Sequence, residues 1–493
     1  MNSLPFDTVM IANRGEIAVR VIRSVRALGL RSALVFHAID AGTPAVAMAD
    51  RAIRIDGATP VAAYLDGGQI VQAALEAGAG AVHPGYGFLS ENVAFARAAA
   101  AAGMIFVGPK PAVIALLGDK VRARRFVAAR GFPVAPSAIE DDDPASFLDR
   151  ARAVGAPLLI KPSAGGGGKG MRIVRDLDDL EPAIAQSRGE GQRYFGDGRL
   201  YAERYVEGAR HIEVQVLGDT HGSVVHLFER ECPVQRRFQK IIEETPSAAL
   251  TPALRRRICE AAAGIAREAG YSNAGHRRVH PRGRRVLFSR DEYAAPGGAF
   301  GHGNETGLDL VAEQLRVAAG RKLPFAQDDV RSTGHAIELR LYAEAPERGF
   351  APTTGRVLSL CWPSGDGVRV DSGIGAGQTV TTAFDPMLAK LVVHGAGRAE
   401  ALDRARRAVR DLVLLGVQTN AAFLARILVD ESFARNDIHT GYLDENPALA
   451  EGSPPDARTA RALLAVAALL TRPVREAAEA VPALHAAIGG WRN

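Results

Sequence analysis

The chain is poor in cysteine and in aromatic residues. Its 493 residues include 3 cysteines and 2 tryptophans, and 6% of all side chains are aromatic. Cys232, Cys259 and Cys361 are far apart and form no C-x-x-C pair, so the sequence signals neither a disulfide framework nor a zinc site. A reducing cytoplasm is therefore the expected location.

Long apolar runs and a strong net charge are absent as well. No window approaches the ~18 uninterrupted apolar residues of a membrane-spanning helix, and "MNSLPFDTVMIANRGE" has no basic segment followed by a long apolar one. The 60 basic and 55 acidic residues leave a net charge of +5, which is too balanced to predict a nucleic-acid or membrane partner. What is present is 47% hydrophobic residues, enough to fill the cores of about three globular domains.

The first part of the chain alternates apolar strands with amphipathic helices. "DTVMIA" predicts a buried strand, "NRGEIAVRVIRSVRALG" a helix and "RSALVFHA" a second strand. The alternation continues through the helix "QIVQAALEAG" and the strands "AGAVHPG" and "MIFVG". This order predicts a doubly wound parallel sheet over roughly residues 1–112.

The pattern changes in the middle of the chain. From about Leu158 the predicted strands come in hairpin-like pairs, "LLIK" with "MRIV" and "IEVQVLGD" with "SVVHLFERE", so this region is expected to be α+β. A third region opens after Gly334 with the strand "HAIELRLYAE" and closes with a predicted helix over residues 398–416. The tail after residue 446 is rich in alanine with proline breaks, which is typical of the start of another module.

The sharpest local motif is "LLIKPSAGGGGKGMRIV", residues 158–174. Successive glycines let backbone N–H groups wrap closely around an anion, and Lys161 and Lys169 add positive charge at both ends. A Walker loop is excluded, because it needs Gly-Lys-Ser/Thr at the start of a helix, whereas Gly170 and a strand follow Lys169 here. The remaining alternative, a flexible glycine hairpin, is disfavoured by the lysines. We interpret the motif as a phosphate cradle.

Two further motifs are polar and ambiguous by themselves. In "YAERYVEGARHIEVQV", Glu203 and His211 are as compatible with a surface carboxylate and a hydrogen-bonded histidine as with ligand binding. In "ERECPVQRRFQKIIEETPS", basic residues including Lys240 alternate with glutamates, which indicates either a solvated charge network or an anion site.

Together, "MIANRGEIAVRVIR", "AVHPGYGFLSENVAFA", "IKPSAGGGGKGM", "HIEVQVLGD", "QRRFQKIIEE", "GHAIELRLYAE" and "FDPMLAKLVVHG" resemble biotin carboxylase, in the version that forms the N-terminal part of acyl-CoA carboxylase α chains. The motifs stand in the family's order over residues 7 to about 446. The resemblance implies a doubly wound N-terminal domain (1–112), an ATP-grasp domain (113–333) with a mobile lid at about 134–206, and a biotin carboxylase C-terminal domain (334–446). Residues 447–493 would be the truncated start of the next α-chain module.

The resemblance also implies roles for individual residues and for partners. Lys240 would face bicarbonate and the transferring phosphate, and the permanently charged Arg340 would stabilise the biotin enolate. The expected ATP-binding residues are Lys120, Lys161, Gly167, Gly168, Glu203, Arg204, Tyr205, Val206, His211 and Gln235. Expected cofactors are ATP with Mg²⁺ or Mn²⁺, and the substrate is biotin on a carrier protein or domain. A carboxyltransferase subunit and a second copy of the chain are the other expected partners.

One segment breaks the family's pattern. Between residues 275 and 306 the length matches, but Arg278 and Arg290 stand at the two metal-binding carboxylates and Glu292 at the asparagine ligand. The Arg, Gln, Val and Glu of the family's bicarbonate site are replaced by Ala294, Pro296, Gly297 and Gly298. Hard divalent cations need carboxylate oxygens, and the missing general base is typically worth ~10²–10⁴-fold in rate. The site as written is predicted to be inactive.

The genetic code suggests a cause for this break. "HRRVHP" can be encoded CAC CGT CGA GTT CAT CCx, which one base out of register reads Thr-Val-Glu-Phe-Ile, the family's motif. "RDEYAAPGGAFGHGNE", shifted in the same way, can read EMNTRLQVEHSVTET directly before "GLDL". We therefore hypothesise that residues 276 to about 282 and 290 to about 305 are translated from the wrong frame, with "GRRVLF" between them in frame.

Three alternatives to an active biotin carboxylase are open. The first is a non-catalytic family remnant that retains at most nucleotide or partner binding. A different ATP-grasp ligase is disfavoured by "FDPMLAKLVV" and "GHAIELR". A nucleic-acid site at "HRRVHPRGRR" has little support, because the run stands where the family has a core strand.

Overall fold

A computed structural model describes residues 4–132, 134–163, 170–205, 208, 210–236, 239–282, 285–292, 306–452 and 456–469. For residues 120, 142, 195, 278–282, 285–292 and 467–469 it describes the backbone alone. The chain separates into two compact units, Met1–Leu449 and Ala450–Asn493.

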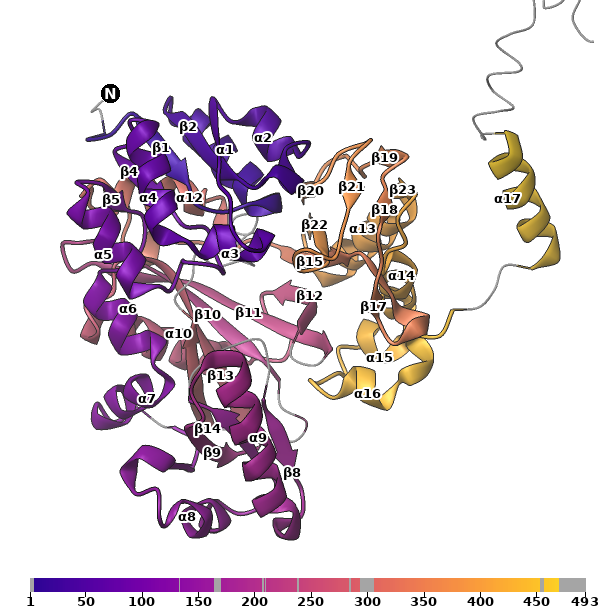
Figure 1. Cartoon of the computed structure of the whole chain (residues 1–493). Helices are drawn as coiled ribbons and strands as arrows, with labels where there is room; N and C mark the ends of the chain where they lie inside the picture. The colour runs from indigo at the N-terminus through magenta and orange to yellow at the C-terminus, as the bar shows by residue number, and fades with distance from the viewer. Residues whose placement is uncertain are drawn as a thin grey trace, which may run out of the picture. The chain divides into compact units, whose positions relative to one another are not determined.

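The first sheet of the larger unit is parallel, as the alternating pattern predicted. Its strand order is β3-β2-β1-β4-β5. Strands β1, β2, β4 and β5 are labelled in Figure 1. The strands are β1 (Thr8–Ile11), β2 (Arg31–Phe36), β3 (Arg51–Arg54), β4 (Ala81–His83) and β5 (Ile105–Phe106). β1, β4 and most of β2 are buried, as expected for inner strands of a sheet covered on both faces, whereas the edge strand β3 is partly exposed.

Helices cover both faces of this sheet. They are α1 (Gly15–Ala27), α2 (Pro44–Met48), α3 (Pro60–Leu65), α4 (Gly67–Glu76) and α5 (Val93–Ala101). Val9 and Ile11 of β1 pack with α1, whereas Met10, which points to the opposite face, packs with α3, α4 and α5. The predicted doubly wound arrangement is confirmed.

A second, four-stranded sheet follows helices α6 (Pro111–Gly118) and α7 (Lys120–Ala129). Its order is β6-β9-β7-β8, with all pairs antiparallel, so the predicted "LLIK"/"MRIV" hairpin is confirmed. The strands are β6 (Ser137–Ile139), β7 (Leu158–Pro162), β8 (Arg172–Val174) and β9 (Leu200–Arg204). Helices α8 (Phe147–Val154) and α9 (Leu180–Phe195) share one apolar core with it. We call this part the small sheet.

The third sheet has eight strands in the order β14-β13-β10-β11-β12-β15-β22-β20. They are β10 (Ile212–Gly218), β11 (Val224–Arg236), β12 (Gln239–Thr245), β13 (Asn273–Arg282), β14 (Arg285–Glu292), β15 (His335–Tyr342), β20 (Val368–Ser372) and β22 (Met387–Gly395). Helix α10 (Pro252–Glu268) packs on Val214 and Val216 of β10 and forms the core of one face. We call this part the large sheet.

The large sheet joins two regions that the sequence pattern separates. Antiparallel pairing of β12 with β15 links the middle of the chain to the region after Gly334. Helix α12 (Leu310–Ala318) connects them along the chain and packs against the N-terminal sheet through Val311 and Leu315. Side chains from all three regions can therefore meet on the face of the large sheet that α10 does not cover.

The rest of the larger unit consists of short elements. The strands are β16 (Glu344–Ala345), β17 (Ala351–Pro352), β18 (Gly355–Arg356), β19 (Ser359–Cys361), β21 (Thr379–Val380) and β23 (Val413–Leu415), and the helices are α13 (Arg398–Asp411), α14 (Ala421–Val429), α15 (Glu431–Ala434) and α16 (Tyr442–Glu445). The prediction of a helix over 398–416 is wrong at its end, because Val413–Leu415 pairs with β19. In the smaller unit the described element is α17 (Ala457–Leu469). Within the described residues, no helix is both long and apolar enough to cross a membrane.

Candidate active site

The small sheet presents a buried ion pair between neighbouring strands. Lys161 on β7 pairs with the Glu203 carboxylate on β9, and the Lys161 ammonium lies 5.5 Å from the ring centre of Tyr201. Burial lowers the pKa of Lys161, but Glu203 more than offsets this, so the pKa is raised and the lysine stays charged. Glu203 is buried, and one of its oxygens has no hydrogen-bond partner among the described residues.

The segment after β9 has its backbone donors already occupied. The N–H groups of Arg204 and Tyr205 donate to the carbonyls of Pro136 and Pro157, each at 2.9 Å. The Arg204 guanidinium donates to the Val154 carbonyl at 3.3 Å. These two residues can therefore offer carbonyl oxygens, but not N–H groups, to a ligand.

The structure describes other predicted nucleotide-binding residues only in part. Gly167, Gly168 and Val206 lie outside the described residues, so their predicted roles stay predictions. Lys120 begins helix α7, where the backbone alone is described.

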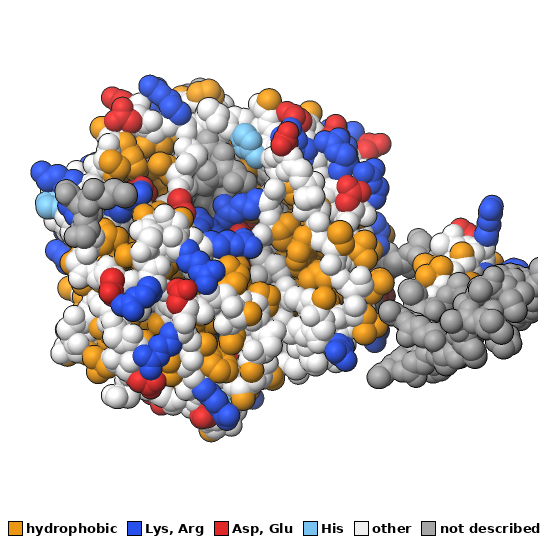
Figure 2. Space-filling view, turned by 90° about the horizontal axis from the view of Figure 1, so that it is seen from above, with side chains coloured by type: hydrophobic (Ala, Val, Ile, Leu, Met, Phe, Trp, Pro, Cys, Tyr) orange, Lys and Arg blue, Asp and Glu red, His pale blue; other side chains and the backbone are white. Residues whose placement is uncertain are grey.

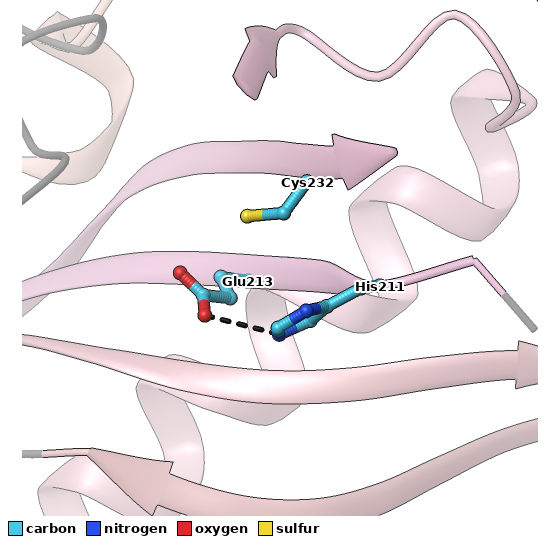
Figure 3. A group of neighbouring side chains, drawn as sticks. All are labelled: His211, Glu213 and Cys232. Atoms are coloured by element: carbon cyan, nitrogen blue, oxygen red, sulfur yellow. Dashed lines mark ion pairs between the residues drawn. The ribbon is translucent and has the colours of Figure 1, made fainter. Parts of the chain in front are cut away.

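His211 and Gln235 meet on the open face of the large sheet. Figure 3 shows Glu213 on β10, His211 directly before this strand, and Cys232 on the neighbouring β11. His211 Nε2 lies 3.0 Å from Glu213 Oε1, and its Nδ1 is hydrogen-bonded to the Gln235 amide, which also donates to the Cys232 carbonyl at 2.9 Å. Both predicted residues therefore belong to one buried cluster.

The carboxylate of Glu213 is neutralised by two cations. Lys240 Nζ donates to it at 2.7 Å and Arg230 Nε at 2.8 Å. Burial alone raises the pKa of Glu213, but Lys240 and Arg230 lower it well below its usual range. His211, Glu213 and Cys232 have the donor atoms for a metal ion. Because the carboxylate is already paired and burial raises the pKa of the Cys232 thiol, we interpret the three as part of a charge network instead.

Glu243 on β12 connects the two residues predicted to be catalytic. Arg340 Nε donates to its carboxylate at 2.7 Å, and Lys240 Nζ lies 3.5 Å from the other oxygen. Arg230 Nε is 3.2 Å from that second oxygen. Lys240 on β12 and Arg340 on β15, which come from different sequence motifs, thus share one buried anion. On the face drawn in Figure 2, lysine and arginine side chains gather near the middle.

A second buried carboxyl, Glu338, lies beside Arg340. Its Oε1 is 3.5 Å from Arg340 Nε, and neither oxygen has a hydrogen-bond partner among the described residues. Burial, followed by the negative charge of Glu243, raises the pKa of Glu338 to about 7. The site therefore contains a carboxyl that changes charge near neutral pH.

The predicted metal positions lie in a row across the edge of the large sheet. Arg278 on β13 is the register partner of Glu213 on one side and of Arg290 on the other, and Glu292 is the partner of His276. Their side chains, and residues 293–305, are not described. Two arginines cannot supply the oxygen ligands that a divalent cation requires. The residues at these positions of the chain as written therefore do not fit the metal.

Glu213, Arg230, Glu243 and Glu338 were not among the predicted site residues. Arg230 and Glu243 stand in the charge-dense motif "ERECPVQRRFQKIIEETPS", and Glu213 and Glu338 alternate with apolar residues in "IEVQV" and "IELRL". Neither pattern by itself distinguishes a solvated face from a buried one.

The fold and these groups define the class of protein. A four-stranded antiparallel sheet with a buried Lys–Glu pair, followed by a large antiparallel sheet with a buried cluster of charged side chains, is the ATP-grasp fold. Comparison with known proteins identifies the family within that class. Residues 5–114 match "Biotin carboxylase, N-terminal domain", 119–281 match "Carbamoyl-phosphate synthase L chain, ATP binding domain" and 338–445 match "Biotin carboxylase C-terminal domain".

Individual relatives agree with these matches. Biotin carboxylase 2 of Bacillus subtilis is 40% identical over 443 residues, covering 90% of this chain and 100% of the relative. The mitochondrial methylcrotonoyl-CoA carboxylase subunit alpha of Rattus norvegicus is 39% identical over 445 residues, or 89% of this chain and 62% of the relative. The crystal structure of the biotin carboxylase domain dimer of the Hydrogenobacter thermophilus 2-oxoglutarate carboxylase, with MgADP, ADP and bicarbonate, superposes with a TM-score of 0.89 at 38% identity, covering 92% of this chain and 100% of that one. The chain belongs to the biotin carboxylase family.

Proposed function

We propose that the protein, with residues 276–282 and 290–305 in the shifted reading, carries out ATP- and bicarbonate-dependent carboxylation of biotin on a carrier protein, as a component of an acyl-CoA carboxylase. The observation that carries the proposal is the Glu243 bridge, which holds Lys240 and Arg340 on one anion. In a reaction that transfers a carboxyl group from bicarbonate to biotin, one cation binds bicarbonate and another stabilises the charge on biotin, and the two cations must lie close together.

The residues have distinct proposed roles. Lys161 and His211 contact the nucleotide, with Lys120, Gly167 and Gly168 at its phosphates and Glu203 to Val206 at its adenine. Lys240 binds bicarbonate and the transferring phosphate. Arg340, whose pKa the adjacent Glu243 holds well above its usual range despite burial, remains charged and stabilises the biotin enolate oxygen.

The metal and bicarbonate loop decides whether the written chain is active. Metal neutralises the charge that develops during phosphoryl transfer, and Arg278 and Arg290 offer it no ligands. Gly298 offers no base for bicarbonate. We propose that the polypeptide as written is inactive and that residues 276 to about 282 and 290 to about 305 are read one base out of frame. The match to the ATP-binding family ends at residue 281, before the second of these segments, which supports the proposal for residues 290 to about 305.

The test compares two full-length chains. One is as written, and the other carries His276→Thr, Arg277→Val, Arg278→Glu, Val279→Phe and His280→Ile, with residues 290–304 replaced by the shifted reading EMNTRLQVEHSVTET. We call the second the restored chain. We expect bicarbonate-dependent ADP formation with free biotin from the restored chain, none above background from the written chain, and loss of the restored activity in Arg340→Met.

Each outcome has a definite meaning. Activity of the written chain equal to that of an active restored chain would contradict the frame hypothesis, as would a gene sequence whose codons are incompatible with the shifted reading. An inactive restored chain that still binds ATP would favour the non-catalytic remnant over the enzyme.

The wider assignments are also proposals. We propose domains at 1–112, 113–333 with a lid at about 134–206, 334–446, and an α-chain segment from 447. A biotin carrier and a carboxyltransferase subunit are the proposed partners, supported by the rat relative being an alpha subunit, and a homodimer is supported by the dimer of the Hydrogenobacter domain. A cytoplasmic location is supported by three free cysteines. The acyl-CoA is chosen by the carboxyltransferase.

A further inference from the structure

Three of the sequence motifs have no role in the proposed chemistry: "ANRGE", "HPGYG" and "FDPMLAK". The structure brings one charged or polar side chain from each of them together. They are Glu16 in the first turn of α1, Tyr86 after β4 and Lys390 in the middle of β22. Lys390 is the register partner of Arg340, so this group lies beside the arginine assigned to biotin.

The contacts within the group are short and buried. Lys390 Nζ lies 2.8 Å from Glu16 Oε1, with side-chain exposures of 0% and 3%. The Tyr86 hydroxyl donates to the same Glu16 oxygen, and the Lys390 ammonium lies 4.6 Å from the centre of the Tyr86 ring. Glu16 Oε2 is buried with no hydrogen-bond partner among the described residues. A buried lysine and glutamate are expected to be strongly destabilising if either loses its partner.

The backbone around the group is fixed from both sides. Asn13 Nδ2 donates to the carbonyls of Pro84 at 2.7 Å and of Tyr86 at 2.8 Å, which ties the turn after β4 to the start of α1. A Cβ at Gly373 would lie 2.6 Å from the Glu16 backbone nitrogen, so the chain after β20 lies directly against the first turn of α1. The ion pair therefore joins the N-terminal region to the last region of the large sheet at a close contact.

Arg340 shares the electrostatic surroundings of this group. Its positive charge acts on the Tyr86 phenol, and both Arg340 and Lys390 act on the carboxyl of Glu338. Among the described residues, Lys390 and Tyr86 are the side chains that contact the Glu16 carboxylate. Arg340 is the register partner of Lys390, so it is the cation on the neighbouring strand to which a Glu16 carboxylate without Lys390 would be exposed.

We propose that Glu16 and Lys390 are positioning residues for Arg340: Lys390 holds the Glu16 carboxylate away from the biotin arginine, and the pair fixes the turn that carries Tyr86. The proposal rests on the proposed function for its kinetic consequence. The claim that the Glu16–Lys390 pair fixes the turn carrying Tyr86 concerns contacts of the chain as written and does not depend on the proposed function.

The kinetic test uses the restored chain and free biotin. We expect Lys390→Met to raise the KM for biotin about tenfold while bicarbonate-dependent ATP hydrolysis without biotin changes less than about twofold. The double variant Glu16→Gln with Lys390→Met should regain most of the biotin affinity, because the competing carboxylate is gone. Loss of packing alone would not be rescued in this way. Lys322→Met, at an exposed lysine, is the matched control.

The second test measures amide hydrogen exchange in the chain as written. Lys390→Met should speed exchange over residues 84–88 and leave α10 unchanged, and Glu16→Gln should do the same. Unchanged exchange in both variants overturns the proposal whatever the kinetics. Faster exchange with an unchanged biotin KM in an active restored chain overturns the role at Arg340. An inactive restored chain refutes the proposed function, and the exchange result then still decides whether the pair fixes the turn.

Discussion

Replacing Glu338 by glutamine is expected to stabilise the protein at alkaline pH and to do less at acidic pH. The carboxyl is fully buried beside Glu243, Arg340 and Lys390, and burial and Glu243 outweigh the two cations, so its pKa rises from 4.5 to about 7. A group with a raised pKa contributes stability that is fully present below its unfolded pKa and is lost as the pH rises through its folded pKa. Glutamine keeps the shape and cannot ionise.

The magnitude follows from the two pKa values. The difference between 4.5 and about 7, at about 1.4 kcal/mol per pKa unit, gives about 3 kcal/mol lost by the wild type between pH 4 and pH 8. About 2 kcal/mol of this falls between pH 5.5 and pH 8. Over that interval the free energy of unfolding of Glu338→Gln should therefore gain about 2 kcal/mol on the wild type.

Urea unfolding at 25 °C, measured at steps from pH 5.5 to pH 8.5, gives this difference directly. Glu347→Gln is the matched control, because Glu347 is exposed and its pKa is lowered by its own backbone and by Gln418, so its charge is constant over the interval. A difference in the free energy of unfolding between Glu338→Gln and wild type that does not change with pH would refute the reasoning. A difference that shrinks as the pH rises would mean that the pKa of Glu338 is lowered on folding, which also refutes it.

Two other substitutions probe the contact between regions and the nucleotide site. Gly373→Ala should lower the thermal midpoint, because its Cβ would lie 2.6 Å from a backbone nitrogen of α1, whereas Gly375→Ala, with its nearest neighbour at 3.6 Å, should not. Lys161→Met should weaken ATP binding measured by calorimetry about tenfold or more, since a charged hydrogen bond is worth about 1.5–3 kcal/mol, and Lys322→Met should leave it unchanged.

Elements whose signal is local were predicted well from the sequence. The parallel strands of the first sheet and the two antiparallel hairpins, β7 with β8 and β10 with β11, follow from apolar runs, alternation and turn residues within short windows. The helix predicted over 398–416 failed at its C-terminal end, because Val413–Leu415 pairs with Ser359–Cys361, far away in the chain. In this segment, pairing with a strand far away in the sequence prevents the helix that the local hydrophobic pattern predicts.

The site divides in the same way. The sequence by itself determined the family motifs, the candidate cations Lys240 and Arg340, and the break at residues 276–305, because motif order and codon register need no coordinates. Only the tertiary structure decided that Glu243 joins Lys240 to Arg340 and that Glu16 pairs with Lys390. Strand register decides which of these side chains meet, and burial decides how strongly their charges interact. Neither can be read from the local pattern of residues.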